Sequence, residues 1–173
     1  MMLLFYLYIC QASFVLFGYV CNVYWERYSA GGQFVSKKDT LDFVIHAVSD
    51  GITAIFLSET TIANNCFYLM SACTDFGLTG PKTKDGRPII AFRPTPLVTS
   101  FLCHDLHFKG LGDSTILNHK DWQLFGFNPE DTLSEFKQLT LCGEIIVQSA
   151  GAVVQISQKA KSMEELVNGF VDS

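Results

Sequence analysis

Charged side chains are scarce in this sequence. Only 17% of its 173 residues are Asp, Glu, Lys or Arg, whereas an ordinary soluble domain has about 25%. Hydrophobic residues make up 49%, and the runs 54–57 and 66–73 are apolar as well as the N-terminus. We expect a chain of this composition to bury surface against lipid or partner subunits as well as against itself.

Several chemical signatures are also missing. The 12 Lys and Arg residues form no basic stripe and the formal net charge is −5, so we expect no nucleic-acid binding, which requires clustered positive charge. The six cysteines include no CxxC pair, which excludes a zinc ribbon and a thioredoxin motif. The turn 110–114 lacks the third glycine of a dinucleotide fingerprint and the lysine of a phosphate loop. The sequence therefore predicts no cofactor.

The N-terminus is a long apolar run instead. Residues 1–21 carry no charge, and about 20 helical residues span the ~30 Å hydrocarbon core of a bilayer. Tyr24, Trp25 and Tyr28 follow, where an interfacial aromatic belt is expected. The pattern predicts one transmembrane helix over residues 1–25, within an anchor and belt of residues 1–28. A cleaved signal peptide and a helix buried in a partner protein are the alternatives; the best cleavage candidate, near Ala12, lies inside the run.

The flanking charges predict an orientation. Arg27, Lys37 and Lys38 follow the apolar run, and nothing basic precedes it. The positive-inside rule then places the bulk of the chain on the cytoplasmic or matrix side. We expect an integral, single-pass membrane protein.

The remaining sequence indicates a linker over residues 29–38 and a single globular domain over 39–173, mainly α with minor β. Ser36 and Asp39 have the spacing of a capping box at the start of a helix that ends near Gly51. The stretch 52–73 reads as a buried helix rather than a second membrane span, because polar residues occupy its middle. Asn128 and Pro129 begin the clearest helix in the chain, which runs to about Leu141.

Four further segments complete this interpretation. Residues 75–87 form a loop, 88–96 are extended, and 97–108 and 159–171 are helical. For residues 142–157 a hairpin and a single apolar helix fit equally well.

The densest polar cluster is Cys103-His104-Asp105-Leu106-His107. His104 and Asp105 are candidate catalytic residues, a histidine base beside a carboxylate. On a helix His104 and His107 share a face, so His104, His107 and the later His119 are candidate metal ligands. The competing interpretation is structural: histidines near a helix end often satisfy a core hydrogen bond.

Two functions follow from these patterns. The leading hypothesis is an accessory or structural subunit of a larger membrane protein complex, in contact with membrane lipid and other membrane subunits, and not an enzyme. The alternative is a small membrane-tethered hydrolase or metal-binding enzyme that uses His104, Asp105 and His107.

Overall fold

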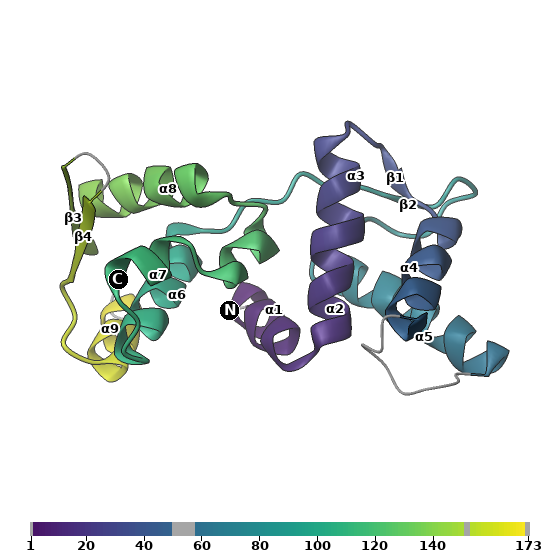
Figure 1. The fold of residues 1–173 in the computed structure, drawn as a ribbon, viewed down its shortest axis with the longest axis horizontal. Helices are drawn as coiled ribbons and strands as arrows, with labels where there is room; N and C mark the ends of the chain where they lie inside the picture. The colour runs from purple at the N-terminus through teal and green to yellow at the C-terminus, as the bar shows by residue number, and fades with distance from the viewer. Residues whose placement is uncertain (1, 50–57, 151–152, 172–173) are drawn as a thin grey trace. The chain divides into compact units, whose positions relative to one another are not determined.

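The chain is mainly helical with two small antiparallel sheets, which confirms the predicted fold class at that level (Figure 1). The structure is a computed structural model that describes residues 2–49, 58–150 and 153–171. Contacts divide the chain into two compact units, Met1–Phe92 (unit 1) and Arg93–Ser173 (unit 2). The sequence instead predicted an anchor, a linker and one domain from residue 39. The difference arises because the N-terminal helices share a core with the segments that follow them.

The helix predicted over residues 1–25 is not continuous in the structure, and a membrane span over these residues stays a prediction. Helix α1 ends at Ala12, and the chain turns by 108° before a second helix over Phe14–Ser29. Ser13 causes the break: it adopts an extended conformation, φ −120° and ψ 98°, and its hydroxyl accepts a hydrogen bond from the Leu16 N–H. A serine that caps a new helix cannot also continue the previous one. The elements are α1 (Met2–Ala12), α2 (Phe14–Tyr19), the π-helical turn η1 (Val20–Trp25) and α3 (Glu26–Ser29).

The break at Ser13 limits the length of each N-terminal helix. Within the described ranges 2–49, 58–150 and 153–171, no helix taken alone has both the length and the hydropathy to cross a bilayer. The bent pair of α1 and Phe14–Ser29 meets the length and composition criteria only when its two parts are taken together.

Unit 1 continues with a two-stranded sheet and two long helices. Strands β1 (Phe34–Val35) and β2 (Arg87–Pro88) pair antiparallel. Helix α4 (Lys37–Ser49) starts with the predicted capping box, in which Ser36 N–H donates to the Asp39 carboxylate and Asp39 N–H donates to the Ser36 hydroxyl. Helix α5 (Glu59–Asp75) begins at the capping residue Ser58. The first part of the helix predicted over 52–73 lies outside the described residues.

Unit 2 is built around one buried helix. Helix α6 (Pro96–Phe108) has eight buried residues and contacts α7, α8 and α9. The helix start predicted at Asn128 and Pro129 is confirmed, and the structure adds that Asn128 and Asp131 form a capping box. The other elements are α7 (Asp113–Leu117), the 3-10 helix η2 (Lys120–Phe125), α8 (Pro129–Leu141), β3 (Ile145–Ala150), β4 (Val153–Gln158) and α9 (Met163–Val171).

The segment 142–157, for which helix and hairpin fitted equally well, is a hairpin. Strands β3 and β4 pair antiparallel from Ile145 opposite Gln158 to Ala150 opposite Val153. Gly143, with φ of 75°, follows the end of α8 in a left-handed conformation that favours glycine. The last helix begins at Met163, four residues later than the predicted start.

Candidate functional site

Helix α1 is apolar on both sides, which is unusual for a helix at a protein surface. Its inward side packs into unit 1, where the Tyr6 ring lies 5.4 Å from that of Phe76 and 5.6 Å from that of Phe92. The side chains buried there are Tyr6, Leu7 and Cys10.

The opposite side of α1 is uncovered. Phe5 keeps 60% of its surface exposed and Met2 57%, while Tyr8 and Ile9 keep nearly half. Helix α1 contains no charged residue. We call these four side chains the outward face of α1. Contiguous exposed apolar surface on a folded protein is a feature of sites that bind a partner or a membrane.

The helix over Phe14–Ser29 is fixed within unit 1. The Tyr19 hydroxyl makes a buried 2.8 Å hydrogen bond with that of Thr40 on α4, and the Tyr19 ring packs edge-on to Phe43. Further along the helix, the Tyr24 hydroxyl donates to the Ile90 carbonyl at 2.7 Å. These contacts hold the helix within the unit, and the turn at Ser13 and the packing of Tyr6 then fix the direction of α1.

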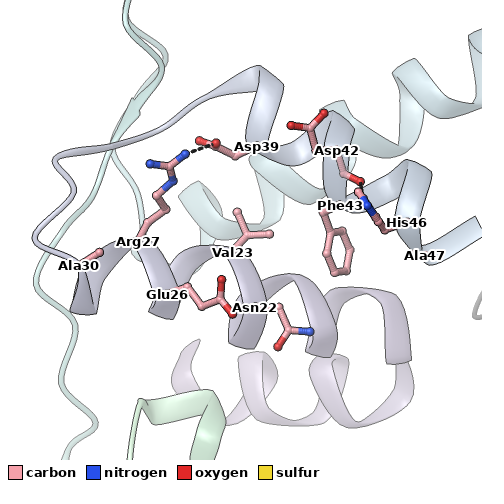
Figure 2. A pocket seen from close by; sticks show the side chains of 10 residues that line it. All are labelled: Asn22, Val23, Glu26, Arg27, Ala30, Asp39, Asp42, Phe43, His46 and Ala47. Atoms are coloured by element: carbon pink, nitrogen blue, oxygen red, sulfur yellow. Dashed lines mark hydrogen bonds and ion pairs between the residues drawn. The ribbon is translucent and has the colours of Figure 1, made fainter. Parts of the chain in front are cut away.

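A cavity of about 640 Å³ lies between this helix and α4 (Figure 2). An ion pair between Arg27 and Asp39 lies along its wall. Burial acts to raise the pKa of the Asp39 carboxyl, but hydrogen bonds from Ser36 and Arg27 outweigh it, so the pKa is lowered. The lining residues are Asn22, Val23, Glu26, Arg27, Ala30, Asp39, Asp42, Phe43, His46 and Ala47.

The polar side chains that line this cavity make contacts within the fold. Asp39 serves the capping box and the ion pair at once, so its oxygens are committed to joining α3 to α4. The His46 ring lies against its own helix, with Nδ1 2.6 Å from the Asp42 carbonyl oxygen. In the parts of the chain that the structure describes, no group of three or more His, Cys, Asp or Glu side chains is placed to hold a metal ion.

His104, the first candidate catalytic residue, is buried in the core of unit 2. Its Nδ1 lies 2.8 Å from the Ser100 carbonyl oxygen one turn earlier on α6. Burial lowers its pKa, against the effect of that hydrogen bond and of Glu144. Its Nε2 is buried without a hydrogen-bond partner among the described residues. A fully buried imidazole that uses its own helix as partner fits the structural interpretation better than a base that meets substrate.

The other residues of that cluster turn to different partners. Asp105 accepts a hydrogen bond from Lys109 at 2.6 Å, so the structure does not use it to orient the His104 ring. His107 packs its ring edge-on to Phe108. His119 caps η2, and its Nδ1 lies 3.5 Å from the Asp121 carboxylate. His104, His107 and His119 do not form a three-ligand group in the described residues.

Cys103, beside His104, is also enclosed. Its side chain is fully buried, and the Gln158 amide donates to its sulfur at 3.8 Å. Burial raises the pKa of this thiol to about 12. Because the thiolate is the reactive and metal-binding form, Cys103 acts as a small apolar core residue.

Comparisons of the chain with protein-family models, with curated proteins and with solved structures found no match.

One residue of the sequence indicates that α1 is a separate, short helix. Ser13 interrupts the apolar run, and a serine before three apolar residues is a helix start. Taken as a break, it divides the run into two helices too short to span a membrane separately. No sequence pattern predicts the cavity in Figure 2, because it forms between two helices that are distant in the sequence.

Proposed function

We propose that the protein is an accessory subunit of a membrane protein complex, held at the bilayer by the outward face of α1. The exposure of Phe5, Met2, Tyr8 and Ile9 on a helix with no charged residue carries this proposal. Lipid is the occupant we favour, because the sequence around this face is free of charge from Met1 to Trp25 and aromatic residues follow it.

The lengths of the helices favour attachment in the plane of the bilayer surface. The 11 residues of α1 rise about 16 Å, and the helix over Phe14–Ser29 rises about 24 Å, at roughly 1.5 Å per residue. Neither reaches the ~30 Å of a hydrocarbon core. The 108° bend keeps the two rises from adding along one axis. A short helix with its apolar side chains at the headgroup boundary is the arrangement of interfacial anchors.

Apolar surface elsewhere supports the subunit role. Large hydrophobic side chains are exposed on α4, α5, α8, β3 and α9 as well as on α1, and Leu141 is 81% exposed. Tyr68 on α5 is 66% exposed and Ile146 on β3 is 57% exposed. Surfaces of this kind are typical of contacts with other proteins. We propose that the bulk of the chain meets its partners on the cytoplasmic or matrix side, where anionic lipid would attract Arg27, Lys37 and Lys38 after the apolar run.

The test of attachment uses the full chain in cells. Phe5→Glu with Ile9→Glu places two carboxylates on the outward face, where each one must lose water to enter the interface. We expect this double variant to move from the membrane fraction to the supernatant. Gln123→Glu with Gln155→Glu is the matched control, because it adds the same charge at exposed positions outside α1 and outside the proposed partner contacts. Membrane release of both variants, or of neither, would contradict the role of α1.

The subunit role is tested separately by mass. We would extract the full chain from native membranes in mild detergent and measure the particle mass after subtracting the detergent. A mass well above the 19.3 kDa of one chain, with other proteins present, supports the proposal. A particle containing this chain alone would overturn the subunit role and leave the attachment unaffected.

A further inference from the structure

A second cavity in unit 1 is lined by positive charge. Its volume is about 600 Å³, and its walls come from the start of α4, the face of α5 and the loop before β2. Five of the 12 Lys and Arg residues of this acidic chain line it, with Asp85 as the single acidic lining residue. The five cations are Lys37, Lys38, Lys82, Lys84 and Arg87; we call this cavity the basic pocket.

Pairing of β1 with β2 assembles the basic pocket from distant segments. Val35 lies opposite Arg87, so the residues after β1 and those before β2 become neighbours. Gly86 makes this approach possible: its φ is 133°, and a Cβ there would lie 2.5 Å from the Val35 carbonyl oxygen. The loop is closed by Thr83, whose N–H and hydroxyl both donate to the Gly86 carbonyl at 2.7 Å.

Among the described residues, the five cations have no ion-pair partner. In residues 2–49, 58–150 and 153–171, no carboxylate oxygen lies within 4.0 Å of any of them. Arg87 turns its terminal nitrogens to hydroxyls, 2.7 Å from Thr74 and 3.4 Å from Ser71, and its Nε is buried without a partner in these residues. Like charges gathered in this way repel one another, and a bound anion would offset that cost.

Another part of the lining of the basic pocket is apolar. Helix α5 contributes Ala63, Cys66, Phe67 and Met70, which recur at i, i+3, i+4 and i+7 and therefore share one face. Phe67 is 63% exposed, so its ring is available to a ligand. The lining of the pocket thus combines five cations with aromatic and aliphatic side chains.

We propose that the basic pocket binds a small phosphorylated molecule with an apolar part, its phosphate among the lysines and its apolar part against α5. A doubly charged phosphate suits several cations better than a single carboxylate does. The volume lies in the range of about 300–1,000 Å³ that small-molecule sites occupy. This site is independent of the outward face of α1, so either can fail without the other.

The experiment titrates the purified full chain with 1-naphthyl phosphate, by calorimetry at low and at physiological salt. We expect saturable binding that weakens as salt rises, because salt screens exposed charges. Lys82→Gln with Lys84→Gln should weaken it by about tenfold, as expected for two partly exposed charge contacts. Both lysines are exposed, so the variant is expected to fold. Lys137→Gln with Lys159→Gln removes the same charge from exposed positions in unit 2 and should bind as the wild type does.

Two further measurements test the apolar lining and the cations of the pocket separately. Phe67→Ala should weaken binding of 1-naphthyl phosphate and leave the weaker binding of inorganic phosphate unchanged. Neutral 1-naphthol should bind far more weakly than its phosphate. Absence of saturable binding, equal binding of 1-naphthol, or equal loss in the Lys137 and Lys159 control would overturn the proposal.

A phosphate of this kind could belong to a soluble molecule or to a lipid headgroup. Vesicles of phosphatidylcholine with and without one-tenth phosphatidic acid distinguish the sources. If phosphatidic acid raises vesicle binding of the wild type but not of the Lys82 and Lys84 variant, the source is lipid. If 1-naphthyl phosphate binds and phosphatidic acid adds nothing, the source is soluble; both results support the pocket.

Discussion

The two units place their polar side chains differently. In unit 1, charged side chains line two cavities at the surface, one around the Arg27–Asp39 ion pair and one among five cations. In unit 2, the polar residues closest together in sequence are divided between the core and separate surface contacts, with His104 enclosed and Asp105 paired to Lys109. Proximity along the chain is therefore a poor guide to proximity in space, and the more promising binding surface belongs to unit 1.

The largest expected effect tests whether the units are separate in stability. Phe136 is fully buried in unit 2, with its ring 5.3 Å from that of Trp122. Phe136→Ala removes a large core side chain, which typically costs about 3–5 kcal/mol. Hydrogen exchange followed by mass spectrometry on the full chain should show lower protection in unit 2 and unchanged protection in unit 1.

An equal loss of protection in both units would contradict their separate stability, because it would mean that they unfold as one cooperative body. Exposed Ser134→Ala, on the same helix as Phe136, serves as the control and should leave both units as they are.

A smaller effect is expected at the loop that assembles the basic pocket. Gly86→Ala forces a Cβ against the Val35 carbonyl at a positive φ, a strain of about 1–3 kcal/mol. Gly169→Ala is the opposite case, since nothing lies within 4 Å of the added Cβ on α9 and alanine favours a helix by about 0.8–1 kcal/mol. Urea unfolding should show opposite signs for the two variants. A neutral Gly86→Ala would contradict the close approach of β1 and β2.

The burial of His104 predicts a pH effect on stability. Its pKa is lowered in the folded state, from a usual value of 6.5. As pH falls below about 6.5, the unfolded chain binds a proton that the folded chain does not, so the free energy of unfolding decreases. The decrease is at most about 1.4 kcal/mol per pH unit for one proton, and it ends below the folded pKa. Above pH 6.5 this destabilising contribution is absent.

Urea unfolding between pH 7.5 and 5.5 measures this effect. His104→Gln removes the titrating group and should flatten the profile in that range. His46→Gln, at an exposed position on α4, should keep most of the slope. If the wild type is equally stable at both pH values, His104 is not held neutral by burial.

The smallest effects are expected at the two capping boxes, one in each unit. The Asn128 side chain accepts hydrogen bonds from the N–H groups of Glu130 and Asp131, and the Ser36 hydroxyl accepts one from Asp39. Asn128→Ala and Ser36→Ala should each cost about 1 kcal/mol in urea unfolding. A loss several times larger at Ser36 would show that it supports the basic pocket as well as α4.

The sequence predicted what local chemistry determines. The predicted features of this kind are found in the structure. They are the capping box at Ser36, the helix start at Asn128, the helix before Lys109 and the loop that follows Asp75, each of which depends on neighbours within a few residues. The start of a helix depends on which side chain can satisfy its first N–H groups, and that information is local. The same reasoning applied to Ser13 would have divided the N-terminal run.

The sites could not be predicted in this way. The cations of the basic pocket looked scattered because Lys37 and Arg87 come together only when β1 pairs with β2. The cluster around His104 looked like a site because its residues are adjacent, but successive helical residues point in different directions. The tertiary packing shows that His104 faces the core, whereas the pairing of Asp105 with Lys109 is a local contact between residues four apart.

One measurement tests the membrane attachment most directly. A spin label at residue 5 of the full chain in vesicles, compared with one at residue 141, reports exposure to lipid-soluble oxygen and to a water-soluble nickel complex. Cys21→Ser and Cys142→Ser leave only buried cysteines, which the label should not reach. We expect the label at residue 5 to be accessible to oxygen and shielded from nickel, and the label at residue 141 to be accessible to nickel. Free access of nickel to residue 5 would contradict the attachment of α1 to the bilayer.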